Sequence, residues 1–132
     1  MRIVACQGVN QETEVLMASL SMEGPCTLDY GTIEAKITRT SPGNYALGEK
    51  NDSGTFLVGY VGRADTDVKT RLKSWVDKTK KPLFKFSYAS SAKAAFEKEC
   101  ENYHDFNPPS NDIHPDRPNG SGWKCPRCKI FD

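Results

Sequence analysis

The clearest pattern along the chain is a pair of apolar segments separated by a polar turn. Residues 55–62 (TFLVGYVG) are rich in β-branched and aromatic side chains, which favour a strand. A shorter apolar segment covers 44–48, and a turn-forming sequence that includes EKNDSG connects the two. The pattern predicts an antiparallel hairpin in this part of the chain.

Two helices and a further strand are predicted after the hairpin. Within 65–78 apolar side chains recur at helical spacing, and Asp65 or Thr66 is placed to cap the helix. Residues 83–89 (LFKFSYA) alternate between apolar and polar side chains, as in a half-buried strand. A second helix is predicted from Ser90 or Ser91 to His104, and its apolar face includes Glu99. Carboxylates rarely face a protein interior unless they are paired or bind a metal.

The two ends of the chain carry weaker signals. Residues 11–20 predict a short helix that ends before Gly24 and Pro25.

At 132 residues the chain has the size of one domain. We expect an α+β fold with a small antiparallel three-stranded sheet flanked by helices. This domain would consist of a lead-in over 1–40, a core over 41–104 and an irregular C-terminal element over 105–132.

Four potential metal ligands lie towards the C-terminus. Cys100 and His104 are four residues apart on one predicted helix, so their side chains point the same way. Cys125 and Cys128 form a CPRC sequence, whose spacing lets two thiolates bind one ion. These four ligands fit a structural Zn²⁺ site without an open position. His114 is the alternative to His104 as the fourth ligand.

Charge and cysteine content narrow the functional classes. The formal net charge of +1 gives no global indication of a nucleic-acid partner. Between Arg63 and Lys85, however, the sequence contains eight basic residues and only three acidic ones. Such an excess is typical of either a solvated surface or a nucleic-acid contact. No apolar run is long enough to span a membrane, and the N-terminus lacks an export signal. With the cysteine cluster, this favours an intracellular location, cytoplasmic or, in a eukaryote, nuclear.

The hairpin and the helices after it resemble the catalytic core of the GIY-YIG nuclease family. Gly43-Asn44-Tyr45 corresponds to the first family motif and Tyr60-Val61-Gly62 to the second. Arg71 lies in the helix where the family has an arginine, and Glu99 lies on the last helix, where the family has a metal-binding glutamate. The resemblance covers roughly residues 41–111.

The resemblance implies metal-dependent hydrolysis of phosphodiester bonds in DNA, or in another nucleic acid, by a single-cation mechanism. Glu99 is expected to hold a catalytic Mg²⁺ or Mn²⁺ and Arg71 to neutralise phosphate charge. Tyr45 would be the base for the attacking water, with Tyr60 beside it. Asn111 stands at about the place of a terminal family asparagine. The substrate would be bound through the basic residues Arg63, Lys69, Lys73 and Lys78.

Three alternatives stay open on the sequence alone. Glu97 is a second possible metal ligand, although helical spacing places it on the solvated side. A salt bridge between Arg71 and Glu99 would explain the inward carboxylate without catalysis. The chain can also be an inactive, zinc-stabilised module that binds nucleic acid or protein on the same scaffold.

Overall fold

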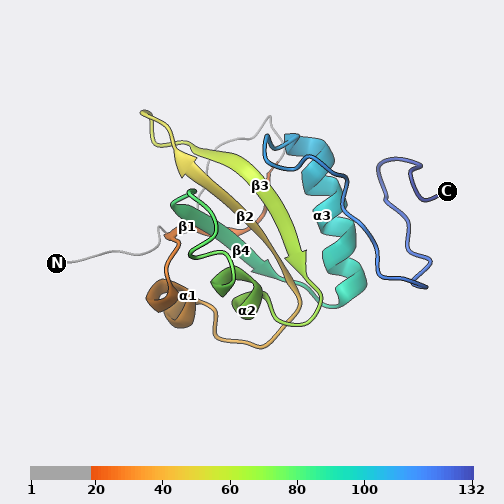
Figure 1. Cartoon of the computed structure of the whole chain (residues 1–132), viewed down its shortest axis with the longest axis horizontal. Helices are drawn as coiled ribbons and strands as arrows, with labels where there is room; N and C mark the ends of the chain where they lie inside the picture. The colour runs from red at the N-terminus through yellow and green to blue at the C-terminus, as the bar shows by residue number, and fades with distance from the viewer. Residues whose placement is uncertain (1–18) are drawn as a thin grey trace.

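The computed structural model describes residues 19–132, which form a four-stranded antiparallel sheet with helices packed on both faces (Figure 1). The strands are β1 (Glu23–Thr27), β2 (Gly43–Lys50), β3 (Phe56–Ala64) and β4 (Leu83–Tyr88), in the order β1-β4-β2-β3. The helices are α1 (Tyr30–Lys36), α2 (Val68–Lys73) and α3 (Ala92–Phe106). The α+β class is confirmed, but the sheet has four strands instead of the predicted three, because β1 pairs with the outer edge of β4.

The predicted hairpin is formed by β2 and β3. Their pairing runs from Gly43 opposite Ala64 to Lys50 opposite Phe56. Because β4 pairs with the other edge of β2, the first hairpin strand is central in the sheet. Residues 43–48 are all buried, as expected for a strand that is covered on both faces.

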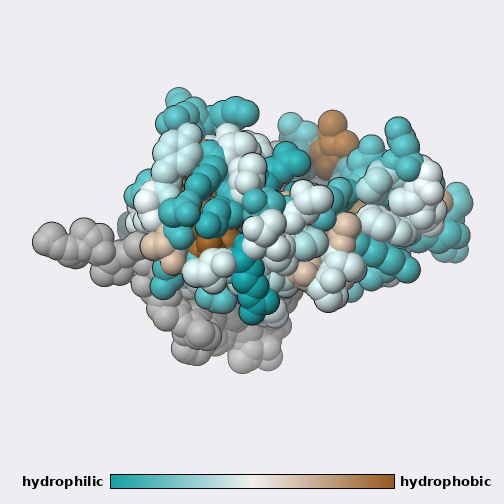
Figure 2. All heavy atoms as spheres, turned by 90° about the horizontal axis from the view of Figure 1, so that it is seen from below, coloured by the Kyte–Doolittle hydropathy of each residue, from teal (hydrophilic) through white to brown (hydrophobic). Residues whose placement is uncertain are grey.

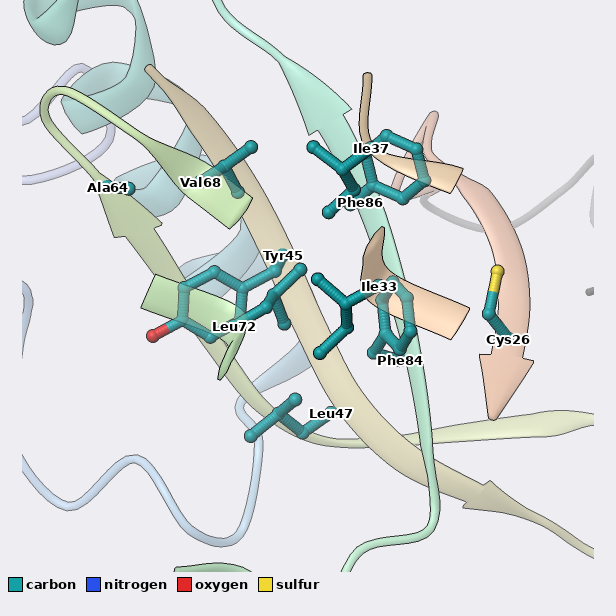
Figure 3. Packing of buried hydrophobic residues seen from close by; sticks show 10 residues of the cluster. All are labelled: Cys26, Ile33, Ile37, Tyr45, Leu47, Ala64, Val68, Leu72, Phe84 and Phe86. Atoms are coloured by element: carbon teal, nitrogen blue, oxygen red, sulfur yellow. The ribbon is translucent and has the colours of Figure 1, made fainter. Parts of the chain in front are cut away.

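The two faces of the sheet have separate cores. On one face, α1 and α2 cover a cluster (Figure 3) made by Cys26, Ile33, Ile37, Tyr45, Leu47, Ala64, Val68, Leu72, Phe84 and Phe86. On the other face, Ala46 and Val61 are packed by Tyr103 and Phe106 of α3. Because successive strand residues face opposite sides, Tyr45 belongs to the α2 face and Asn44 to the α3 face.

Two elements of the lead-in were not predicted. β1 contains Pro25, and α1 is only seven residues long, with the Asp29 side chain accepting a hydrogen bond of 2.7 Å from the backbone N–H of Thr32. The helix predicted over 11–20 lies outside the described residues, apart from its last two positions, which are not helical. No helix in the described part of the chain is long and apolar enough to cross a membrane.

The bounds of α3 agree with the prediction better than those of α2. For α3 the Ser91 N-cap is confirmed, with its side chain accepting a hydrogen bond from the backbone N–H of Ala94, and the helix extends two residues beyond His104. For α2 the predicted range 65–78 was too long. Asp67 caps the helix, which ends at Lys73 and is followed by turns.

Candidate metal centre and catalytic face

The structure brings two histidines and two cysteines together at the C-terminal end of α3. The ligand atoms of the group all lie within 4.8 Å of one another: His104, His114, Cys125 and Cys128. Cys128 Sγ is 3.4 Å from His114 Nε2, near the separation of about 3.6 Å between sulfur and nitrogen ligands around a tetrahedral zinc ion. The group can therefore hold a metal ion.

This group differs from the predicted one in a single ligand. His104, Cys125 and Cys128 belong to it, but His114 is present in addition to His104, and Cys100 is not a member. Cys100 lies one turn earlier on α3, fully buried in a cluster with Cys125. Helical spacing correctly placed Cys100 on the same side as His104. Only the path of the C-terminal segment decides which of these side chains meets the other ligands.

Hydrogen bonds around the group suit metal binding. His114 Nδ1 is 2.7 Å from the carbonyl oxygen of Pro115, and donation to this oxygen leaves Nε2 as a free lone pair. His104 Nε2 is buried without a hydrogen-bond partner, an arrangement that is costly unless a ligand satisfies it. Burial raises the pKa of Cys125, but the Arg127 backbone N–H, 3.3 Å from Sγ, and other nearby donors outweigh this effect and lower it.

Residues 107–132, called the tail below, follow α3. The start of the tail is hydrogen-bonded to the free edge of β3, and the rest runs beside α3 (Figure 1). The backbone N–H of Ser110 donates to the carbonyl oxygen of Gly59 at 2.9 Å. The Asn111 side chain accepts from the Val61 N–H at 2.8 Å and donates to its carbonyl oxygen at 3.0 Å. These bonds satisfy backbone groups that an edge strand would otherwise expose.

Tyr45 and Tyr60 are neighbours on β2 and β3. Their ring centroids are 6.3 Å apart, and Trp75 Nε1 donates a hydrogen bond of 2.8 Å to the Tyr45 hydroxyl. Gly62 is opposite Tyr45 in the strand pairing, and a Cβ atom at Gly62 would lie 2.4 Å from the Tyr45 hydroxyl oxygen. The glycine of the second motif therefore makes room for the phenol of the first.

Arg71 and Glu99 both act electrostatically on this tyrosine pair. Burial raises the pKa of both phenols; the charge of Glu99 raises it further and that of Arg71 lowers it. Arg71 is exposed on α2, whereas Glu99 comes from α3 and is buried. The inward orientation predicted for Glu99 is confirmed. The charges of Arg71 and Glu99 thus both act on the two tyrosines.

The carboxylate of Glu99 is paired with Arg63 and not with Arg71. Arg63 Nη1 donates to Glu99 Oε1 at 2.7 Å and to the carbonyl oxygen of Asp116 at 2.8 Å. Arg63 Nε donates to Asp65 Oδ1 at 2.7 Å. Burial raises the pKa of Glu99, and the partly compensating charge of Arg63 lowers it. The proposed structural salt bridge therefore exists, but with a different arginine.

An open depression lies beside α2 and the segment that leads into it. It has a volume of about 350 Å³ and is lined by Ala64, Asp65, Thr66, Asp67, Thr70, Arg71 and Ser74. Arg71 and Asp65, the exposed partner of Arg63, both line it. Of the four predicted catalytic residues, Arg71 lines this depression, and Tyr45, Tyr60 and Glu99 do not.

Two of the basic residues expected to bind the substrate are paired with an acidic residue of α1. Lys69 and Lys73 of α2 both form ion pairs with Glu34, whose carboxylate is held ionised because hydrogen bonds from Lys73 and Lys69 lower its pKa. Lys78 is exposed in the turns after α2. The face shown in Figure 2 is largely hydrophilic, with hydrophobic atoms in small groups. Such exposed ion pairs are weak enough to exchange partners.

Comparison with known proteins finds no family model that matches the chain, no similar curated protein and no similar solved structure. The resemblance to the GIY-YIG family therefore depends on the motif residues themselves. Function has to be inferred from the chemistry that these side chains can perform.

Proposed function

We propose that the protein is a metal-dependent endonuclease that hydrolyses phosphodiester bonds in DNA, or in another nucleic acid, at a GIY-YIG-like site. The proposal is carried by two phenols on adjacent strands that lie within the electrostatic influence of one arginine and one buried glutamate. The packing of Tyr45 against Gly62 supports the proposal, because the glycine of the second motif leaves the space that the tyrosine of the first motif occupies.

Each side chain has a distinct task in this reaction. A Mg²⁺ or Mn²⁺ ion held by Glu99 would polarise the scissile phosphate and stabilise the leaving oxygen. Arg71, exposed beside the depression, neutralises the charge on the phosphoryl oxygens. Tyr45 accepts the proton of the attacking water. Burial raises the pKa of its phenol, and the Trp75 N–H and the charge of Arg71 partly offset this rise. Tyr60 packs beside Tyr45 and holds its ring in place.

We further propose that the group of His104, His114, Cys125 and Cys128 is a structural zinc site. Nitrogen and sulfur donors in a four-ligand set are those that zinc prefers, and the buried His104 Nε2 without a partner fits this role. Four protein ligands leave no position for a reactive water. The zinc would therefore hold the tail in place, and the hydrolytic chemistry would belong to Glu99.

A binding module without activity is the second candidate. The observation that favours it is that Glu99 already has a guanidinium partner, while Tyr45 is only 2% exposed. Such a module would use the exposed lysines and Arg71 for sequence-independent contacts with phosphates, and its affinity would fall steeply with salt.

The test is incubation of the zinc-loaded protein with plasmid, single-stranded and branched DNA, and with RNA, in Mg²⁺ or Mn²⁺. Glu99→Gln is the inactivating variant, and Glu97→Gln is its control, because Glu97 is only half-buried on the same helix. We expect the wild type and Glu97→Gln to cut a substrate and Glu99→Gln to bind it without cutting. Binding without cleavage by all three proteins would establish the binding module instead.

A further inference from the structure

We propose that Asp65 and Asn44 complete the cation site at Glu99, and that Arg63 occupies this site until a divalent cation replaces it. The inference rests on the proposed role of Glu99 as a cation ligand and assigns the residues that act with it. A single carboxylate is a sparse ligand set, and the surroundings of Glu99 contain further oxygen atoms.

The first observation is that one guanidinium is shared by two carboxylates. Arg63 uses Nη1 to reach Glu99 and Nε to reach Asp65, each at 2.7 Å. A cation in the place of this guanidinium would therefore meet carboxylate oxygens from two different segments. The Glu99 side chain is 10% exposed and that of Asp65 is 42% exposed, so Asp65 lies on the solvent side, where it lines the depression.

The second observation is independent of the acidic residues. Asn44 is fully buried, and its Oδ1 has no hydrogen-bond partner. Its Nδ2 donates at 2.9 Å to the carbonyl oxygen of Ala95, one helical turn before Glu99. Asn44 also pairs with Arg63 across β2 and β3, so both side chains project towards the same face of the sheet. The Asn44 side chain, with its unpartnered amide oxygen, therefore lies on the same face of the sheet as the ion pair.

Together these groups form an oxygen-rich set of the kind that Mg²⁺ and Mn²⁺ prefer. Asp65 and Glu99 carry two negative charges, of which Arg63 balances one. A divalent cation would balance both and would release the guanidinium. The freed Arg63 is then available to contact a substrate phosphate. Cation binding and phosphate binding are coupled in this way.

The experiment is a titration of the zinc-loaded protein with Mn²⁺ alone, in the absence of nucleic acid, with free Mn²⁺ measured by electron paramagnetic resonance. We expect Asp65→Asn to weaken Mn²⁺ binding by about tenfold or more, and Asn44→Leu to weaken it by several-fold. Asp77→Asn, an exposed acid in the turns after α2, is the matched control and should leave binding unchanged.

Arg63→Gln distinguishes a lost ligand from poor folding. The proposal predicts tighter Mn²⁺ binding in this variant, because the competing guanidinium is removed. A misfolded protein would not show this gain. Loss of binding in Glu99→Gln with unchanged binding in Asp65→Asn and Asn44→Leu would overturn the inference and leave the proposed cation role of Glu99 standing. Mn²⁺ binding that is also unaffected in Glu99→Gln would overturn both.

Discussion

The sheet and the tail are held in place by different means. Under α1 and α2 the core is a continuous cluster of ten buried residues (Figure 3). The tail on the other side shares a much smaller buried cluster with α3, made by Phe96, Cys100 and Cys125. Trp123 and Phe131 of the tail pack against this cluster. Further attachments are polar: the side chain of Asn111, the Arg63 contact with Asp116, and the metal-binding group.

This difference shows which part of the molecule depends on a metal. The sheet and its α1–α2 core are stabilised by burial of apolar surface, which needs no ion. The tail is rich in turn-forming residues and buries little apolar surface, so its position depends on ligands and individual hydrogen bonds. The proposed chemistry lies where the two regions meet, because Arg63 joins Glu99 to the tail two residues beyond His114.

The largest expected effect is in the apolar region. Phe84 is fully buried in the α1–α2 core, and Phe84→Ala should lower the free energy of unfolding by about 3–5 kcal/mol because it leaves a cavity. Urea denaturation measures the change. Ile113→Ala is the control in the tail, where the side chain is 79% exposed. Equal effects of the two substitutions would contradict the comparison.

The metal-binding group gives the next prediction. His114→Ala should remove the bound metal ion, whereas Cys100→Ala should retain it, because Cys100 is outside the group. Elemental analysis of the purified variants measures the metal content per chain. Metal loss in Cys100→Ala with full retention in His114→Ala would restore the ligand set that helical spacing suggested.

A smaller effect is expected where the two motifs meet. In Gly62→Ala the added Cβ would lie 2.4 Å from the Tyr45 hydroxyl oxygen, and the displaced phenol should cost about 1–3 kcal/mol of stability. Gly31→Ala is the matched control, since its Cβ would meet nothing closer than 3.8 Å. Thermal melting compares the two variants. An undisturbed Gly62→Ala protein would remove the steric link between the motifs.

The smallest effect concerns the edge of β3. Asn111→Ala removes two hydrogen bonds to Val61 and should cost about 1–2 kcal/mol of stability. Hydrogen exchange at the Val61 amide should become faster, while amides paired between β2 and β4 keep their protection. If exchange accelerates equally across the sheet, the tail and the sheet are one cooperative unit.

The elements that were predictable are those set by local patterns. The hairpin, β4 and α3 follow from apolar periodicity, and the Ser91 cap and inward Glu99 follow from their places in the helix. β1 and α1 were missed because both are short and are defined by partners elsewhere: β1 by pairing with β4, and α1 by packing on α2 and the sheet. The sequence near Asp29 does contain a capping signal.

The parts of the site that the sequence did not predict depend on long-range geometry. Spacing along α3 placed Cys100 with His104, but only the folded tail brings His114 to the same point. Arg63 was expected at a phosphate, and its pairing with Glu99, 36 residues away, has no local signature. The buried position of Asn44 likewise follows from α3 covering its face of the sheet.

The most direct test is DNA cleavage at fixed Mg²⁺ before and after a zinc-selective chelator removes the structural ion. The account predicts that cleavage is lost, because the released tail no longer holds α3, and with it Glu99, in place, while hydrogen exchange shows the β2–β4 pairing intact. Restored zinc should restore cleavage. Full activity in the zinc-free protein would contradict the link between the metal-tied tail and the catalytic face.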